Sequence, residues 1–309
     1  MKISWHEQGI CRTESFYDTQ LFTRLMAVKI GIIGGSGLEK IGILKDTQEI
    51  KIETPFGPPS DTITQGKIND VDVVFLPRHG RHHSIAPHKV NYRANIFAMK
   101  QCGVEYLIST AAVGSLKKEI KPCDLVIADQ LIDRTFKRDS TFFDNEMVAH
   151  VSLADPFCST LSDLAYTVAK QEANIHRGTY ICMEGPQFST RAESNLYRSW
   201  DVDVIGMTLA PEAKLAREAE ICLCGILAVT DYDCWYEEED DVSVASIIDN
   251  LNKNTATLGR ILPKLIPKIT YKRTCDCHHA LDTAMITPMD YIKKHGNPRV
   301  AEVLLKRFK

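Results

Sequence analysis

The sequence predicts an α/β fold, in which a single domain has a central mixed, largely parallel β-sheet flanked by helices. Two observations lead to this prediction. Short apolar runs rich in valine and isoleucine recur along the chain, each with the length of a buried strand. Stretches in which apolar residues repeat with helical spacing lie between several of them, and this alternation is typical of sheets with parallel strands.

The individual elements follow from these patterns. Strands are expected at residues 28–33, 71–76, 106–109, 125–128, 179–183, 202–205 and 221–229. Helices, marked by apolar side chains on one face, are expected at residues 161–169, 211–219 and 244–262. Pro211 supports the second helix, because proline is favoured at a helix start.

The chain is expected to form one domain with terminal extensions. No internal repeat or linker-like segment interrupts residues 28–267, which we predict to be the domain. Residues 1–27 carry several charges and lack an uninterrupted apolar run, which argues against a signal peptide and favours a poorly ordered extension. Residues 268–309 are predicted to be a C-terminal tail.

Composition excludes several classes of partner. The 309 residues are 44% hydrophobic and 25% charged, values typical of a soluble globular protein. A net charge of -3 gives no reason to expect nucleic acid as a partner, and no apolar run is long enough to predict a membrane span. The 10 cysteines, many of them in apolar runs, favour a reducing compartment, which we expect to be the cytoplasm and also the nucleus.

Two segments suggest metal ligands, but neither has a convincing pattern. In Cys275–His279 the two cysteines are separated by one residue, which is not the usual zinc spacing, and no second pair follows. The segment 78–83 contains three histidines without a nearby acidic ligand. The sequence therefore predicts no metal site.

Two carboxylates follow the predicted strand at 221–229. Asp231 and Asp233 lie where ligand sites form in α/β sheets, beyond the carboxyl ends of the strands. Neighbouring buried carboxylates are costly unless they meet a metal, a cation or a proton-carrying ligand. A purine is such a ligand, since its N7 accepts a proton and its exocyclic amine donates hydrogen bonds.

Groups suited to an anion follow other predicted strands. Arg78 and His79 come directly after residues 71–76, and arginine is the preferred partner of a phosphate oxygen pair. The glycine-rich turn at 34–37 and the small-residue loops at 110–115 and 206–208 expose backbone N–H groups. Each segment alone could be structural. Several converging at one sheet edge predict an anion site, although the turn matches no dinucleotide or nucleoside triphosphate motif.

From Lys29 to about Leu262 the chain resembles the 5'-methylthioadenosine phosphorylases, a trimeric family within the purine nucleoside phosphorylase superfamily. The matching blocks are Ile33–Leu38, Thr54–Gly57, Arg78–Arg81, Lys89–Tyr92, Glu184–Arg191, Gly206–Thr208 and Thr230–Trp235. The resemblance implies the nucleoside phosphorylase fold and the family reaction. In that reaction 5'-methylthioadenosine and phosphate give adenine and 5-methylthioribose 1-phosphate, within purine and methionine salvage.

The resemblance also implies roles for individual residues, a homotrimer and no cofactor, with inorganic phosphate as co-substrate. The residues expected to hold phosphate are Ser36, Arg78, His79, Ala111, Ala112 and Thr208. Those expected to contact base and ribose are Phe188, Met207, Asp231 and Asp233. Those expected to line the pocket for the 5' group are Val244, Ile247, Ile248 and, from a neighbouring subunit, His150 together with a residue of the C-terminal tail.

Asp231 is the expected catalytic residue. Cleavage of the glycosidic bond builds negative charge on the leaving base, and a proton at N7 stabilises it. A buried Asp beside another carboxylate should have a raised pKa and can carry that proton. The pair also favours adenine, because the O6 acceptor of a 6-oxopurine would repel two carboxylates.

Three other functions remain open at this stage. They are a broader purine nucleoside phosphorylase acting on adenosine or 6-oxopurine nucleosides, a hydrolytic nucleosidase that uses water, and a non-catalytic nucleotide sensor. Several residues also depart from the family pattern. Ala111 stands where many relatives have Thr, and Gln187, Gly206 and Leu209 also differ, which could widen the nucleoside specificity.

Overall fold

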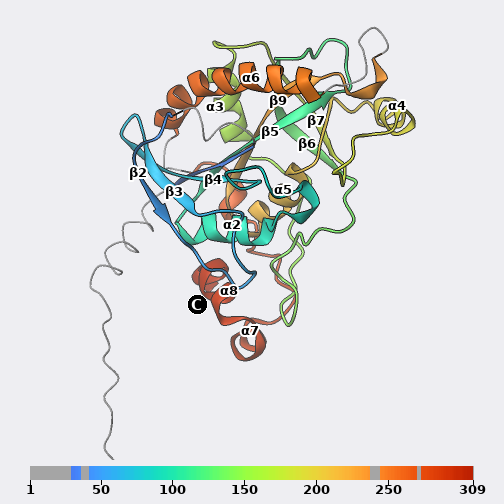
Figure 1. Cartoon of the computed structure of the whole chain (residues 1–309). Coiled ribbons are helices and arrows are strands. Elements are labelled where there is room, and N and C mark those ends of the chain that lie inside the picture. Colours follow the sequence, from blue (N-terminus) through green and yellow to red (C-terminus); the bar gives the residue numbers. More distant parts are fainter. Residues whose placement is uncertain (1–28, 36–41, 237–243, 270–272, 309) are drawn as a thin grey trace, which may run out of the picture.

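The computed structural model describes residues 29–35, 42–236, 244–269 and 273–308, with the side chains of residues 244–246 also left undescribed. The predicted N-terminal extension at 1–27 and Ser36 therefore lie outside the described residues. One sheet of nine strands forms the centre of the described chain (Figure 1). No described helix is long and apolar enough to cross a membrane.

The strands, in their order across the sheet, are β2 (Lys45–Ile50), β3 (Ile63–Ile68), β4 (Val71–Pro77), β1 (Ile30–Gly34), β5 (Tyr106–Ser115), β8 (Val204–Gly206), β7 (Ile175–Cys182), β6 (Leu125–Asp133) and β9 (Cys222–Asp231). Strands β4, β1, β5 and β9 run parallel, as do β6, β7 and β8. Antiparallel pairs join β2 to β3, β3 to β4, β5 to β8 and β6 to β9. Because β9 pairs with both β5 and β6, five of these strands close into a ring.

Helices cover both faces of the sheet, as predicted. The α-helices are α2 (Tyr92–Gln101), α3 (Ser159–Ala169), α4 (Arg191–Ser199), α5 (Leu209–Glu218), α6 (Val244–Leu265), α7 (Met289–His295) and α8 (Pro298–Leu304). The shorter 3-10 helices are η2 (Pro87–Lys89), η3 (Asp233–Trp235), η4 (Ile266–Lys268), η5 (Asp276–His279) and η6 (Lys306–Phe308). The mixed sheet between helices confirms the predicted fold class.

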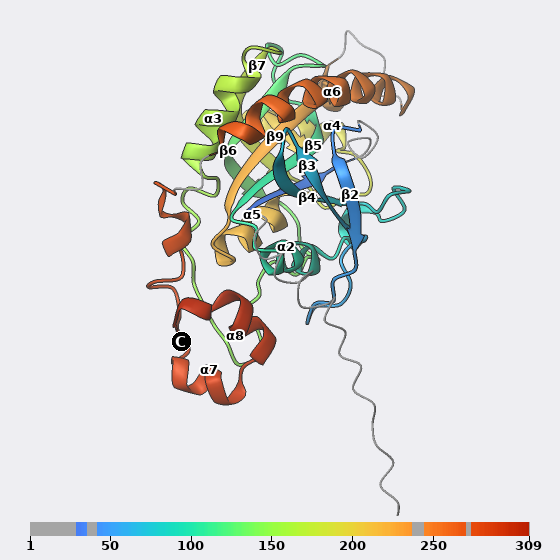
Figure 2. The ribbon, with the colours of Figure 1, turned by 90° about the vertical axis from the view of Figure 1, so that its left-hand side faces the viewer.

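Alternate residues of the strands pack against the two helical layers. In β1, Ile30 and Ile32 contribute to the core under α3 and α6, whereas Ile33 contributes to the core under α2 and α5. This alternation is the period of two that a strand imposes on its side chains. Figure 2 shows α3 and α6 on one side of the sheet and α2 and α5 on the other. Both faces are buried, which explains the continuous apolar runs.

The C-terminal segment packs on the domain. Leu281, Ile292, Val300 and Leu304 are buried in the same core cluster as α2 and α5. In Figure 2 the helices α7 and α8 lie together beyond α2, at the end of the molecule away from α6.

Two sequence predictions about local structure were wrong. The small-residue segment 110–115 is not a loop, because β5 continues to Ser115 while it pairs with β9 and β8. The helix assigned to 211–219 begins earlier, at Leu209, with Pro211 in its first turn. Proline is tolerated there because the first helical N–H groups lack partners within the helix.

Several elements were missed for a common reason, since their sequences carry weak apolar signals. Strand β2 is mostly exposed and polar, and it is positioned by its pairing with β3. Helix α4 is mostly polar and begins with a capping box between Thr190 and Glu193.

Candidate active site

A cavity of about 430 Å³ opens where β1, β4, β5, β8 and β9 end. It brings together most of the residues predicted for the site. Those lining it are Arg78, His79, Ala111, Ala112, Phe188, Met207, Thr208, Asp231, Asp233 and Ile247. The convergence follows from the fold, because strand ends that are far apart in the sequence meet at one edge of the sheet.

Four predicted residues are not placed in this cavity. Ser36 lies outside the described residues, although its neighbour Gly35 lines the cavity. Val244 begins α6, but its side chain is not described. Ile248 is 49% exposed and does not line the cavity, and His150 is exposed on a segment whose backbone bonds to Ala284.

Arg78 is fully buried at the end of the site where phosphate is expected. Its Nε donates to Glu212 Oε1 at 2.5 Å, and one Nη2–H donates to Glu212 Oε2 at 3.2 Å. The other Nη2–H donates to Ser109 Oγ and one Nη1–H donates to Thr110 O. Four of the five guanidinium N–H groups are therefore engaged, and the remaining Nη1–H is available to an anion in the cavity.

Glu212 fixes this guanidinium and was not identified from the sequence. Its side chain is fully buried and also accepts a hydrogen bond from Ser109 Oγ at 2.6 Å. Burial alone would lower the pKa of Arg78, but the negative charge of Glu212 and its hydrogen bonds outweigh burial and raise it. The only signal was the position of Glu212 in the first turn of a helix behind a strand end.

His79 is held as a neutral ring in the free site. Burial, followed by the charge of Arg78, lowers its pKa to about 4. Its Nδ1 lies 2.8 Å from Ile85 O, and since a carbonyl accepts, the Nδ1 carries the proton. The Nε2 of His79 is then an acceptor.

Asp231 ends β9, and the strand order places β1 and β5 between β9 and β4, the strand that Arg78 follows. Thr230 Oγ1 donates to its Oδ2 at 2.7 Å, and the Asp233 N–H donates to its Oδ1 at 2.9 Å. Burial raises the pKa of Asp231, and these two hydrogen bonds offset the effect only in part. Burial thus shifts this carboxyl group toward its protonated form relative to an exposed Asp.

Asp233 provides a second carboxyl group two residues further on. Burial raises its pKa, the neighbouring Ser194 hydroxyl opposes the rise, and the charge of Asp231 adds to it. Its Oδ2 is buried and has no hydrogen-bond partner within the described residues. An unpaired buried acceptor is costly unless a ligand supplies a donor. The base of a nucleoside with an exocyclic amine would supply one.

Two glycines leave room for this arrangement. A Cβ at Gly114 would lie 3.0 Å from Asp231 Oδ1 and 3.4 Å from Asp233 Cβ, which would crowd the carboxyl pair. A Cβ at Gly206 would lie 2.7 Å from the Tyr180 hydroxyl. That hydroxyl accepts a hydrogen bond from the Thr208 N–H at 3.0 Å and so positions the start of α5. Gly206 therefore leaves the space that the Tyr180 hydroxyl occupies.

The chain is similar to known proteins over most of its length. A family model described as the phosphorylase superfamily matches residues 29–267.

The chain belongs to the phosphorylase superfamily.

Its curated relatives in this superfamily include proteins named S-methyl-5'-thioadenosine phosphorylase. The protein of Thermosynechococcus vestitus is 51% identical over 287 residues, covering 91% of this chain and 99% of the relative. The protein of Geobacter sulfurreducens is 55% identical over 261 residues, covering 84% of this chain and 91% of the relative.

Solved structures of the superfamily confirm the fold. A methylthioadenosine phosphorylase from an antarctic soil metagenomic library has a TM-score of 0.85 and 45% identity, covering 90% of this chain and 99% of that one. The methylthioadenosine phosphorylase of Schistosoma mansoni in complex with adenine has a TM-score of 0.78 and 35% identity, covering 82% and 96%.

Arg138 is a further buried residue of the site that the superfamily motifs did not indicate. Its guanidinium donates to the backbone oxygens of Met207 and Glu184 and, at 3.0 Å, to the Tyr92 hydroxyl. It also forms an ion pair with the Glu184 carboxylate at 3.3 Å. Arg138 thus joins the segment after β7 to the segment after β8, both of which line the cavity. No local motif marks it, because all these contacts are distant in the sequence.

Proposed function

We propose that this protein catalyses phosphate-dependent cleavage of 5'-methylthioadenosine to adenine and 5-methylthioribose 1-phosphate. The observation that carries the proposal is the polarity of the cavity. Two buried carboxyl groups lie at one end, and Arg78 with the backbone of Thr208 lies at the other. A nucleoside bridges these ends, with its base at the carboxyl groups and its ribose above phosphate.

The phosphate end supplies charge and hydrogen bonds. Arg78 offers a fixed positive charge and one unused N–H, and its pairing with Glu212 prevents it from turning away. The N-terminus of α5, which begins directly after Thr208, adds the favourable field of the helix dipole. Neutral His79 accepts a hydrogen bond from the O–H of monohydrogen phosphate through Nε2. Ser36, Ala111 and Ala112 complete this proposed phosphate site.

The chemical step displaces adenine by phosphate. A phosphate oxygen forms a bond to C1' of the ribose while the C1'–N9 bond breaks, and the bonding electrons leave with the base. Asp231 delivers its proton to N7 and neutralises the departing adenine. The Asp233 Oδ2 accepts a hydrogen bond from the 6-amino group, which removes the cost of its unpaired burial. Asp231 then regains a proton from solvent.

The methylthio group requires an apolar slot. Ile247 lines the cavity from α6, and Phe188 and Met207 line it beside the base. Val244 and Ile248 belong to the same proposed surface on α6. An apolar pocket discriminates between a methylthio group and a hydroxyl by only about 1–3 kcal/mol, so slower turnover of adenosine is expected.

We propose a homotrimer in which His150 of the partner subunit closes this slot. The support is the position of its segment, since Ala149 pairs with Met285 and the Ile286 N–H donates to Val148 O. Val148 is 42% exposed and Ile286 62% exposed, so the His150 segment and the C-terminal tail share one apolar surface. Light scattering that gave a monomer at enzyme-assay concentration would contradict this assembly.

The reaction is tested by measuring free base with and without phosphate. The substrates are methylthioadenosine, adenosine, methylthioinosine and inosine. We expect adenine release from methylthioadenosine only when phosphate is present, with slower release from adenosine. Phosphate-independent release would indicate a nucleosidase, a preference for inosine would indicate a 6-oxopurine phosphorylase, and no release at all would indicate a sensor.

The same proposal places the protein in purine and methionine salvage, with small molecules as its ligands and no cofactor. We expect it in the cytoplasm and also in the nucleus, and imaging of the tagged full chain tests that location. A signal confined to another compartment would contradict it.

A further inference from the structure

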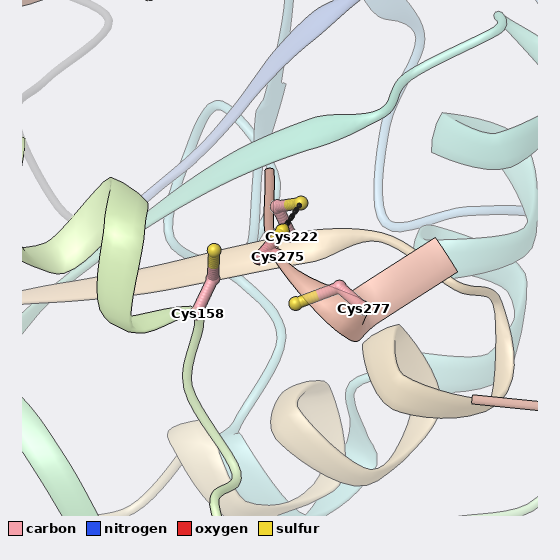
Figure 3. A group of neighbouring side chains, drawn as sticks. All are labelled: Cys158, Cys222, Cys275 and Cys277. Atoms are coloured by element: carbon pink, nitrogen blue, oxygen red, sulfur yellow. Dashed lines mark hydrogen bonds between the residues drawn. The ribbon is translucent and has the colours of Figure 1, made fainter. Parts of the chain in front are cut away.

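Four cysteines from three separate parts of the chain meet on the far side of the fold from the nucleoside cavity. Cys158 directly precedes α3, Cys222 begins β9, and Cys275 and Cys277 belong to the tail around η5. Their sulfur atoms all lie within 4.8 Å of one another. Figure 3 shows the four side chains gathered in one place, with the Cys222 and Cys275 sulfurs next to each other. None of them lines the nucleoside cavity.

We propose that Cys158, Cys222, Cys275 and Cys277 bind a single zinc ion. Zinc in structural sites takes four thiolates in a tetrahedron with Zn–S distances near 2.3 Å, which places the sulfur atoms about 3.8 Å apart. The Cys222 and Cys275 sulfurs lie 3.3 Å apart, and the others need shifts of only about 1 Å to reach this geometry. A multi-iron cluster would require the sulfurs to lie around a larger inorganic core.

The sequence around Cys275 and Cys277 contains no second cysteine pair. The fold instead brings Cys158 and Cys222 to them from distant segments. Cys222 and Cys275 are 53 positions apart, so no local spacing could have revealed the set.

The surroundings suit a soft cation. Cys158, Cys222 and Cys277 are buried, and Cys275 is partly buried. On binding, zinc displaces the thiol protons, which pass to solvent.

An adjoining cavity provides an entry path and a donor for the sulfur atoms. This cavity, of about 480 Å³, is lined by Cys158, Cys275 and Cys277 together with two arginines and three aspartates, Arg177, Arg217, Asp129, Asp155 and Asp276. The Arg217 Nε is buried and has no hydrogen-bond partner in the described part of the chain. Such a donor is typical of the groups that hydrogen-bond to zinc-bound sulfur.

Zinc here would fasten the C-terminal tail to the domain. The ligands join residues 275–277 to the start of β9 and to the start of α3. Beyond them, the tail runs on to Met285 and Ile286, the segment proposed to reach a neighbouring subunit. The zinc site does not depend on the proposed reaction, since its residues are separate from the nucleoside cavity.

The test measures metal content of the full chain purified without chelators, under a non-thiol reductant. We expect about one zinc per chain by elemental analysis, and less than about one tenth of that in Cys158→Ala and Cys277→Ala. Cys102→Ala is the matched control, because Cys102 is also buried but lies outside the cluster, and it should retain full zinc. Chelation should lower the Tm of the wild type and leave that of Cys158→Ala unchanged.

Cobalt gives a second readout if the variants fold poorly. Wild-type protein stripped of metal and supplied with Co²⁺ should show the thiolate charge-transfer and visible bands of a tetrahedral tetrathiolate site. The proposal is overturned if the wild type binds neither metal, if iron replaces zinc at full occupancy, or if mass spectrometry finds Cys222 and Cys275 joined in a disulfide under the same reductant.

Discussion

Asp231→Asn should reduce the turnover of methylthioadenosine by about 100-fold or more, with a much smaller effect on binding. The reason is the proton at N7. Burial raises the pKa of Asp231, so a neutral carboxyl group can deliver its proton to the departing base, whereas an amide cannot. Single-turnover measurement of adenine release separates this chemical step from binding and product release.

Asp233→Asn is the matched control for this prediction. The unpaired Asp233 Oδ2 is proposed to hold the 6-amino group, so its loss should raise KM more than it lowers kcat. If Asp231→Asn retained near-normal turnover, or if both variants changed kcat equally, Asp231 would have no special role in proton transfer.

The stability of Asp231→Asn distinguishes a catalytic defect from misfolding. A carboxyl whose folded-state pKa is raised contributes stability that is complete below its unfolded pKa and is lost as pH rises through the folded pKa. At neutral pH the ionised form is therefore disfavoured in the folded protein. Because Asn carries no charge, the variant should have an equal or higher Tm at neutral pH. The wild-type kcat should likewise fall as pH rises through the raised pKa.

The sequence was sufficient to predict which residues meet at the cavity when those residues directly follow strands. Asp231 and Arg78 each stand next to an apolar run, and the rule that ligands bind beyond strand ends places them together. The roles of Glu212 and Arg138 could not be found in this way. Glu212 is 134 positions from Arg78, and their contact exists only after folding brings the start of α5 to the end of β4.

The errors in predicted secondary structure have the same physical origin, which is contact between segments that are distant in the sequence. Residues 110–115 are small and flexible in isolation, and they form a strand because β9 lies alongside them. The mostly exposed β2 has no apolar alternation, because its partner β3 and not its own sequence holds it in the sheet. The cluster of Cys158, Cys222, Cys275 and Cys277 depends most strongly on the fold, because three distant segments must come together before the four sulfur atoms meet.

Arg78→Met should both destabilise the protein and abolish efficient use of phosphate. Arg78 and Glu212 are 1% and 0% exposed, so removing the guanidinium leaves an uncompensated charge in the interior. Such a loss costs about 3–5 kcal/mol in the free energy of unfolding. The missing N–H and charge at the phosphate should lower kcat/KM for phosphate by about 100-fold. Denaturant unfolding and phosphate titration measure the two effects separately.

The double variant Arg78→Met with Glu212→Gln decides whether the two effects are independent. Glutamine can still accept the hydrogen bond from Ser109 Oγ but carries no charge, so most of the lost stability should return. Phosphate use should not return, because the guanidinium is still absent. Recovery of both would mean that Arg78 only balances Glu212 and that phosphate binds elsewhere. Recovery of stability alone would show that Arg78 has two separate roles. Some of its N–H groups pair with Glu212, and the remaining N–H is directed to the substrate.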